Sequence, residues 1–224
     1  MIVAPTEAAL RREMVALGRS LYAGGLIVAG EGNFSVRLDE RRLLVTPSGL
    51  CKGELSESDL VMIDVEGRLR SGRRGPSSEV LLHLEVYRRR PDVQAVVHAH
   101  PPHCIALMLA GKGLDLPLLA ENVILLGKVP TADFALPGTG AVPDSIRPWI
   151  EGTNCILLDR HGSLSVGESL REARFLLETM EQTAKTYLLA LRAGNVAPLP
   201  MAMVRELERL RREAYGLTAP VIPF

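Results

Sequence analysis

The chain has 224 residues, with 26 basic and 26 acidic side chains, so its formal net charge is zero. This balance provides no basic surface for nucleic acid or an anionic membrane, and we expect neither as a partner. No apolar run approaches the roughly 18 to 20 residues that span a bilayer, and the N-terminus lacks a signal-peptide pattern. The three cysteines form no CxxC pair, which fits a reducing compartment, so we expect a cytoplasmic protein.

Apolar spacing and turn residues in the first half of the chain predict short strands between two helices. The first helix covers residues 6–23 and stops at a pair of glycines. Strand-like runs follow at residues 26–28, 34–38, 42–46 and 60–65. A second helix begins at Ser77 or Ser78 and ends before Pro91, because a residue before proline disfavours helix.

The second half of the chain continues this mixture. A strand over 93–98 leads into a helix over 103–109, and another strand-like run spans 123–129. Short strands follow at 155–158 and 164–166, then a long helix over 169–192 and a charged helix over 201–215. No linker composition divides the chain, so we expect one α/β or α+β domain over residues 1–224, with a central sheet.

Three histidines stand at predicted strand ends. His98 and His100 end an apolar run and should project to the same side, because strand side chains alternate between faces. His161 ends a second apolar run, directly before a glycine. The His-x-His spacing alone is equally typical of a solvated strand face. Together the three imidazoles would suit zinc or a similar divalent ion with one open coordination position.

Three turn-like segments share Gly, Ser and Asn, at residues 31–35, 46–49 and 75–79. Each alone is typical of an ordinary turn or helix cap. Taken together, their hydroxyls, amides and backbone N–H groups could bind a phosphate without Lys or Arg, helped by a helix start after Ser78. None matches a Walker loop or a dinucleotide fingerprint, so nucleotide binding has little support.

Several polar residues near these motifs have two interpretations. Glu79, in the first turn of the second helix, is either an acid that complements the helix dipole or, near a metal, a ligand or general base. We expect His83 and His103 to pack or to support ligands rather than bind a metal themselves. Cys104 and Cys155 are expected to be buried packing residues.

Five short motifs occur in one order, and they carry a family resemblance. They are residues 32–37 (GNFSVR), 46–49 (TPSG), 76–79 (PSSE), 97–100 (VHAH) and 160–162 (RHG). With them the chain resembles the class II aldolase/adducin-head family over nearly its whole length, and within it L-fuculose-1-phosphate aldolase most of all. The resemblance implies a three-layer α/β/α domain with a central mixed sheet. It also implies a homotetramer with active sites between subunits.

The resemblance implies a metal-dependent cleavage of a ketose 1-phosphate, such as L-fuculose 1-phosphate or a deoxypentulose 1-phosphate. The products would be dihydroxyacetone phosphate and an aldehyde, formed through a metal-stabilised enediolate. The implied ion is Zn²⁺, with Mn²⁺ or Co²⁺ as alternatives, held by His98, His100, His161 and Glu79. Glu79 would also move protons. The implied phosphate-binding residues are Gly32, Asn33, Ser48, Gly49, Ser77 and Ser78.

The sequence departs from the fuculose-phosphate aldolase pattern at one proton donor. A family tyrosine is expected near Leu119, where this chain has none. A second family tyrosine, in a Tyr-Gly-Leu motif, is matched by Tyr215, which we predict to be catalytic. The missing tyrosine suggests a less hydroxylated aldehyde, or epimerase, dehydratase or decarboxylase chemistry on the same metal site. A non-catalytic, adducin-type assembly module is the alternative from another class.

Overall fold

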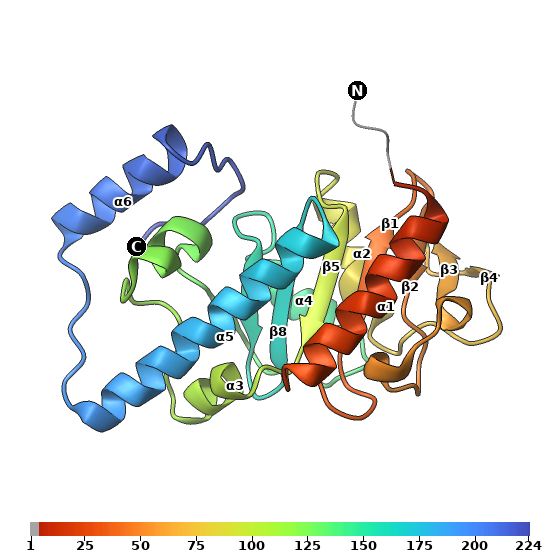
Figure 1. The fold of residues 1–224 in the computed structure, drawn as a ribbon, viewed down its shortest axis with the longest axis horizontal. Coiled ribbons are helices and arrows are strands. Elements are labelled where there is room, and N and C mark those ends of the chain that lie inside the picture. Colours follow the sequence, from red (N-terminus) through yellow and green to blue (C-terminus); the bar gives the residue numbers. More distant parts are fainter. Residues whose placement is uncertain (1–4) are drawn as a thin grey trace.

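The computed structural model describes residues 5–224, which form one eight-stranded sheet with helices on both faces (Figure 1). The strands are β1 (Asn33–Arg37), β2 (Arg42–Val45), β3 (Val61–Asp64), β4 (Leu69–Ser71), β5 (Ala95–Ala99), β6 (Thr131–Ala132), β7 (Cys155–Leu158) and β8 (Gly162–Gly167). The helices are α1 (Glu7–Ala23), α2 (Val80–Arg89), α3 (Pro102–Leu109), α4 (Ala141–Ile146), α5 (Leu170–Ala193) and α6 (Met201–Glu213). Three single turns complete the described chain: η1 (Lys52–Glu54), η2 (Glu57–Asp59) and the π-helical η3 (Asn122–Leu126).

The strand order in the sheet is β4-β3-β2-β1-β5-β8-β7-β6. The edge strand β6 runs parallel to β7, and every other neighbouring pair is antiparallel, so the sheet is mixed. The central strand β5 has β1 on one side and β8 on the other. Because both neighbours run opposite to β5, their first residues lie beside its last residues.

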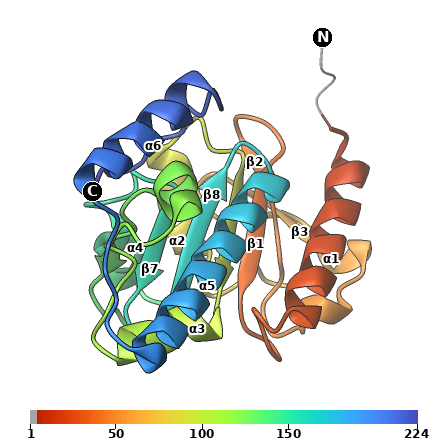
Figure 2. The same cartoon turned by 60° about the vertical axis from the view of Figure 1, so that its left-hand side comes forward.

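Two hydrophobic layers sandwich the sheet. On β5, Val97 faces the cluster formed with α1, α3 and α5, while Val96 faces the cluster formed with α2 and α4. This alternation follows from the period of two along a strand. Figure 2 shows α5 and α1 on the near face of the sheet and α2 and α4 behind it. The predicted three-layer α/β/α domain with a mixed sheet is therefore confirmed.

Two predicted strands are wrong. Residues 26–28 form a turn, and most of residues 123–129 form η3. The side chain of Asn122 accepts a bond from Leu118 N–H (3.1 Å) and donates to the Gly127 carbonyl (3.2 Å), which closes this turn. A short apolar run has no period that separates a strand from a buried turn, so these local bonds decide the outcome.

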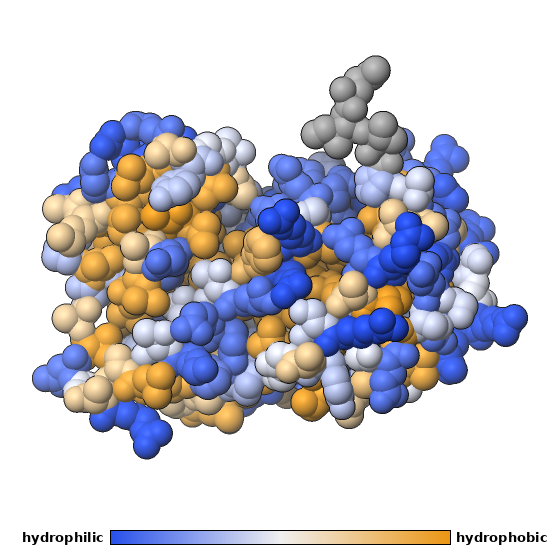
Figure 3. Space-filling view, in the orientation of Figure 1, coloured by the Kyte–Doolittle hydropathy of each residue, from blue (hydrophilic) through white to orange (hydrophobic). Residues whose placement is uncertain are grey.

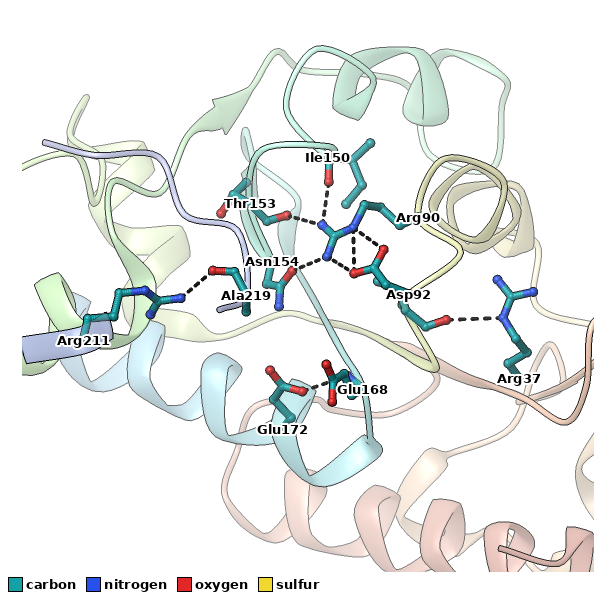
Figure 4. A network of polar contacts seen from close by, with 11 residues as sticks. Arg37, Arg90, Asp92, Ile150, Thr153, Asn154, Glu168, Glu172, Arg211 and Ala219 are labelled. Atoms are coloured by element: carbon teal, nitrogen blue, oxygen red, sulfur yellow. Dashed lines mark hydrogen bonds and ion pairs between the residues drawn. The ribbon is translucent and has the colours of Figure 1, made fainter. Parts of the chain in front are cut away.

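A buried arginine joins α2 to the segment before β7, at the end of β5 opposite the histidines. Arg90 is only 6% exposed, and its guanidinium donates to the carbonyls of Ile150 (3.0 Å) and Thr153 (3.3 Å) (Figure 4). It also donates to Asn154 Oδ1 (2.8 Å) and Asp92 Oδ2 (2.7 Å). One side chain therefore satisfies several acceptors on two segments far apart in sequence.

Replacing Arg90 with methionine is expected to lower the free energy of unfolding by about 2–4 kcal/mol, because buried acceptors lose their donor. Urea denaturation of the purified variant measures this change. The matched control is Arg19→Met on the exposed side of α1, which should stay within about 0.5 kcal/mol of the natural protein. Equal stabilities for the two variants would contradict the structural role given to Arg90.

No helix in the described chain combines the length and apolar character that crossing a bilayer requires.

Candidate active site

The predicted metal ligands meet at one end of the three central strands. His98 lies on β5 and His100 just beyond its end, while His161 lies in the turn between β7 and β8. The fourth residue, Glu79, directly precedes α2, on the sheet face that His98 shares. The antiparallel register places Asn33, the first residue of β1, opposite His98.

The ligand atoms of these four side chains lie within 4.8 Å of one another. The Nε2 atoms of His98 and His100 are 3.0 Å apart. Glu79 reaches two histidines, with Oε2 lying 3.3 Å from His98 Nε2 and Oε1 lying 3.1 Å from His161 Nε2. The structure thus brings together all four residues that the sequence analysis singled out, and His83 and His103 lie outside this cluster.

The imidazoles are oriented by groups around the cluster. His98 Nδ1 donates to the carbonyl of Ser163 (2.9 Å), which leaves the lone pair of Nε2 facing the other ligands. His100 Nδ1 lies 3.4 Å from Glu31 Oε2. Gly162 leaves room for these rings, because a Cβ there would lie 3.0 Å from His100 Cδ2 and 3.2 Å from His98 Cε1.

The protonation of the cluster suits a cation. Burial opposes the charge of Glu79, but the neighbouring ring nitrogens of His161 and His98 outweigh it, so the pKa of this carboxyl lies far below its ordinary value. Burial, together with the nearby His98 and His161, lowers the pKa of His100 to about 3. A carboxylate and a neutral imidazole are the forms that bind a metal ion.

The geometry also fits a divalent ion. Two nitrogens that each lie ~2.0–2.1 Å from one tetrahedral zinc ion are separated by ~3.3–3.4 Å, and the closest ligand atoms here are 3.0, 3.1 and 3.3 Å apart. The buried Oε1 of Glu79 has no hydrogen bond of acceptable geometry within residues 5–224, although His161 Nε2 lies nearby. A cation held between the ligands would satisfy this oxygen.

A buried chain of hydrogen bonds runs from Glu79 into the α2 layer. Asn33 Nδ2 donates to Glu79 Oε2 (2.9 Å), and Asn33 Oδ1 pairs with His83 Nε2. His83 Nδ1 lies 2.6 Å from Ser35 Oγ, which lies 2.9 Å from the Tyr87 hydroxyl.

Each proton in this chain has only one consistent position. Burial, reinforced by His98, lowers the pKa of His83 to about 3, so its ring is neutral. Because Asn33 Oδ1 can only accept, His83 Nε2 carries the ring proton and Nδ1 accepts from Ser35. Tyr87 then donates to Ser35. This series of hydrogen bonds therefore orients the amide of Asn33 so that its NH₂ group faces Glu79.

The three polar segments also converge. Thr46 joins the first two, since its Oγ1 accepts from Phe34 N–H (3.1 Å) and its N–H donates to the Phe34 carbonyl (3.0 Å). The second and third are joined by Ser48 N–H to the Gly75 carbonyl (3.1 Å) and by Ser77 N–H to the Thr46 carbonyl (3.2 Å). We call residues 31–35, 46–49 and 75–79 the first, second and third polar loops.

The details of the polar loops differ from the sequence expectation. The N–H groups of Ser48 and Ser77 are used between the loops, while those of Gly32, Gly49 and Ser78 have no partner within residues 5–224. The helix begins later than expected, because α2 starts at Val80 and its N-cap residue is Glu79, although Ser77 Oγ accepts from Glu79 N–H (3.3 Å). The side chain of Glu79 makes no cap bond, since it turns toward the histidines instead.

The predicted catalytic Tyr215 lies away from this cluster. It follows α6, which packs against η3, and its side chain is 62% exposed. Leu119, where a family tyrosine was expected, is half-buried beside Thr183 and Tyr187 of α5. Figure 1 shows α6 well away from β5, the strand that carries His98.

The sequence analysis missed one basic residue at the polar loops. Lys52 is 2% exposed, and its Nζ donates to the carbonyls of Gly30 (2.6 Å) and Leu50 (2.9 Å), which flank the first and second polar loops. The only sequence feature that could have pointed to Lys52 is its position, three residues after the second polar loop. An isolated lysine in a charged segment gives no sign that it is buried.

The family model described as class II aldolase and adducin N-terminal domain matches residues 12–188. The chain belongs to this family, and it is a metal-dependent lyase of the class II type. This agrees with the fold and with a cluster that could hold a metal ion.

Relatives that catalyse different reactions have similar sequence identities to this chain. The 3-oxo-tetronate 4-phosphate decarboxylase of Haemophilus influenzae is 34% identical, covering 91% of this chain and 98% of the relative. The 5-methylthioribulose-1-phosphate/5-deoxyribulose-1-phosphate aldolase of Rhodospirillum rubrum is 35% identical, covering 93% of each chain. A solved L-fuculose 1-phosphate aldolase is 31% identical with a TM-score of 0.82, covering 89% of this chain and 94% of that one.

Proposed function

We propose that this protein cleaves a ketose 1-phosphate into dihydroxyacetone phosphate and an aldehyde. The observation that carries the proposal is the bond from Asn33 Nδ2 to Glu79 Oε2, because it joins the polar loops directly to the metal-ligand cluster. An anion on the loops and a carbonyl at the cluster then lie a short distance apart. A ketose 1-phosphate has this arrangement, since its phosphate is one carbon from its carbonyl.

The residues of the site have distinct proposed roles. His98, His100, His161 and Glu79 would hold a divalent ion, which would supply Lewis-acid stabilisation of the negative charge that develops on the substrate. The six loop residues named in the sequence analysis would bind the phosphate. Glu79 would move a proton at the carbon that carries the enediolate charge, acting as general base and acid. The amide of Asn33 would keep the carboxylate oriented for this transfer.

The proton donor for the aldehyde oxygen is proposed to come from another copy of the chain. Tyr215 is exposed and stands apart from the cluster of its own chain, which suits a role across a subunit boundary. Apolar residues gather at the end of the molecule that carries α6 and η3 (Figure 3), and Leu125 and Met203 are exposed there. This surface supports the predicted homotetramer.

The identity of the metal ion, the domain organisation and the cellular location stay predictions from the sequence. Zn²⁺ is the proposed ion, because three imidazoles and one carboxylate are ligands that zinc accepts, while Mn²⁺ and Co²⁺ share much of this ligand chemistry. The single-domain organisation over residues 1–224 and the cytoplasmic location are likewise unchanged as predictions.

Decarboxylation of a 3-oxo acid 4-phosphate is the second candidate. Its substrate also has a phosphate next to the carbonyl, and loss of CO₂ would leave the same enediolate that aldol cleavage produces. This reaction needs no proton donor for an aldehyde oxygen, which fits a chain with Leu119 where a tyrosine was expected. The decarboxylases among its relatives also favour this candidate. Epimerase, dehydratase and assembly-module functions have no such specific support.

A substrate screen coupled to detection of dihydroxyacetone phosphate tests the proposal. Fuculose, rhamnulose, ribulose and 5-deoxyribulose 1-phosphates would be compared with 3-oxo-tetronate 4-phosphate, while aldehyde and CO₂ are measured separately. We expect aldehyde release, fastest from the 5-deoxy substrate, because the missing tyrosine favours a less hydroxylated aldehyde. Release of CO₂ alone would assign the second candidate. Turnover of fuculose 1-phosphate at the rate of the best substrate would refute the preference for a less hydroxylated aldehyde.

A further inference from the structure

The backbone of Lys52 is held tightly in place. It is the first residue of η1, which packs against α1. Gly18 of α1 makes this contact possible, because a Cβ at that position would lie 2.1 Å from the Lys52 carbonyl oxygen. Any larger residue would push η1 away from the helix. The lysine side chain therefore starts from a rigid point and extends into the protein.

The ammonium group of Lys52 ends between two polar loops. Nζ donates to the carbonyl of Gly30, two residues before Gly32 of the first loop, and to that of Leu50, directly after Gly49 of the second. These two bonds, of 2.6 and 2.9 Å, join segments that are 20 residues apart in the chain. Gly32 and Gly49 each have an N–H group without a partner within residues 5–224.

The charge of Lys52 lacks a direct counter-ion. The salt bridges formed within residues 5–224 do not include this ammonium group, and only 2% of the residue is exposed. Burial lowers its pKa, while Glu79 and Cys51 favour its charged form. A buried cation without a paired carboxylate is costly, so an anion bound nearby would stabilise it.

We infer that Lys52 is a positioning residue for the substrate phosphate, tying the first two polar loops together and balancing the charge of the anion bound there. The inference rests on the proposed function, since it takes these loops as the phosphate site. It also adds a basic residue behind loops that were expected to bind phosphate without Lys or Arg. The lysine acts from behind the loops, through the two carbonyls it bonds, so it is not assigned to catalysis.

Inorganic phosphate is the probe that tests this role without requiring turnover. Calorimetric titration of the zinc-loaded protein should show that Lys52→Met binds phosphate at least tenfold more weakly than the natural protein. Lys52→Gln keeps donors for the two carbonyls but removes the charge. Its phosphate affinity should therefore fall between those of Lys52→Met and the natural protein. Lys185→Met, which removes an exposed lysine from α5, is the matched control and should leave the affinity unchanged.

Two further measurements separate positioning from a general loss of structure. Zinc content should stay at the natural level in both Lys52 variants, because Lys52 is not a metal ligand. With a turned-over ketose phosphate, KM should rise more than kcat falls. Phosphate affinity within twofold of the natural protein in a folded Lys52→Met would overturn the inference. Failure of both Lys52 variants to fold would also overturn it, because it would make the residue purely structural.

The outcome for Lys52 can be told apart from the outcome for the proposed function. Weaker phosphate binding in the variants, with no turnover of any ketose phosphate, would support Lys52 and reject the aldolase assignment. Unchanged binding, with turnover by the natural protein, would reject only the role of Lys52. No phosphate binding by the natural protein would overturn the inference together with the loop assignment.

Discussion

Replacing His161 with alanine is expected to remove the bound metal and the lyase activity together. His161 lies in the turn between β7 and β8, and its Nε2 faces Glu79 Oε1 at 3.1 Å. Residues that merely orient metal ligands contribute ~10–100-fold to affinity or activity, so loss of a ligand should cost more than ~100-fold. Metal analysis of the purified variant and product formation at saturating substrate measure both effects.

His103→Ala is the matched control for this variant. His103 lies on α3, and its Nδ1 pairs with Glu181 Oε1 (2.7 Å), outside the metal-ligand cluster. It should keep both metal and activity near the natural level. A His161→Ala protein with a full complement of metal and normal turnover would refute the metal assignment. An unfolded variant is not expected, because the side chain belongs to a turn rather than to the core.

Replacing Glu79 with glutamine is expected to lower kcat by ~10²–10⁴-fold at saturating zinc, the range that general acid–base catalysis contributes. The amide keeps the shape of the side chain but cannot accept a proton at pH 7. It also weakens metal binding, so kcat must be measured with zinc in excess. KM should change less than kcat, because the polar loops that bind phosphate remain.

Deuterium exchange isolates the proton transfer from bond cleavage. In D₂O the natural protein should exchange one hydrogen on the hydroxymethyl carbon of dihydroxyacetone phosphate, and Glu79→Gln should not. Proton NMR measures this exchange. Glu178→Gln, a change in a half-buried carboxylate that pairs with Arg174 on α5, is the control. Exchange by zinc-loaded Glu79→Gln at the natural rate would contradict the proton-transfer role of Glu79.

The helices could be predicted from sequence because apolar spacing and breakers mark them clearly. The first helix and the long helix before Gly194 form almost as expected, at Glu7–Ala23 and Leu170–Ala193. The apolar run 123–129 was predicted wrongly, because Asn122 supplies bonds that close a turn. Residues 69–71 carry no apolar pattern and form β4 only by pairing with β3. Such elements depend on a neighbour that local patterns cannot identify.

The residues of the site likewise include some that the sequence predicted and others that it did not. Strand alternation predicted that His98 and His100 share a side, the end of a second apolar run added His161, and the resemblance implied that Glu79 is a ligand. The role of His83 was left general, because its partners Asn33 and Ser35 lie 50 and 48 residues away in sequence. Lys52 was missed because burial of a single charged residue has no local signature.

The sequence by itself therefore determined the family, the layered architecture and the residue types that meet at the site. These follow from short-range periodicity and from motifs, which are local properties of the chain. Only the tertiary structure decided which donors face which acceptors: the amide of Asn33 turned toward Glu79, the unsatisfied Oε1 of Glu79, and the ammonium of Lys52 between two loops. The physical reason is that hydrogen bonds and the cost of burying charge depend on distances of a few ångströms between segments far apart in sequence.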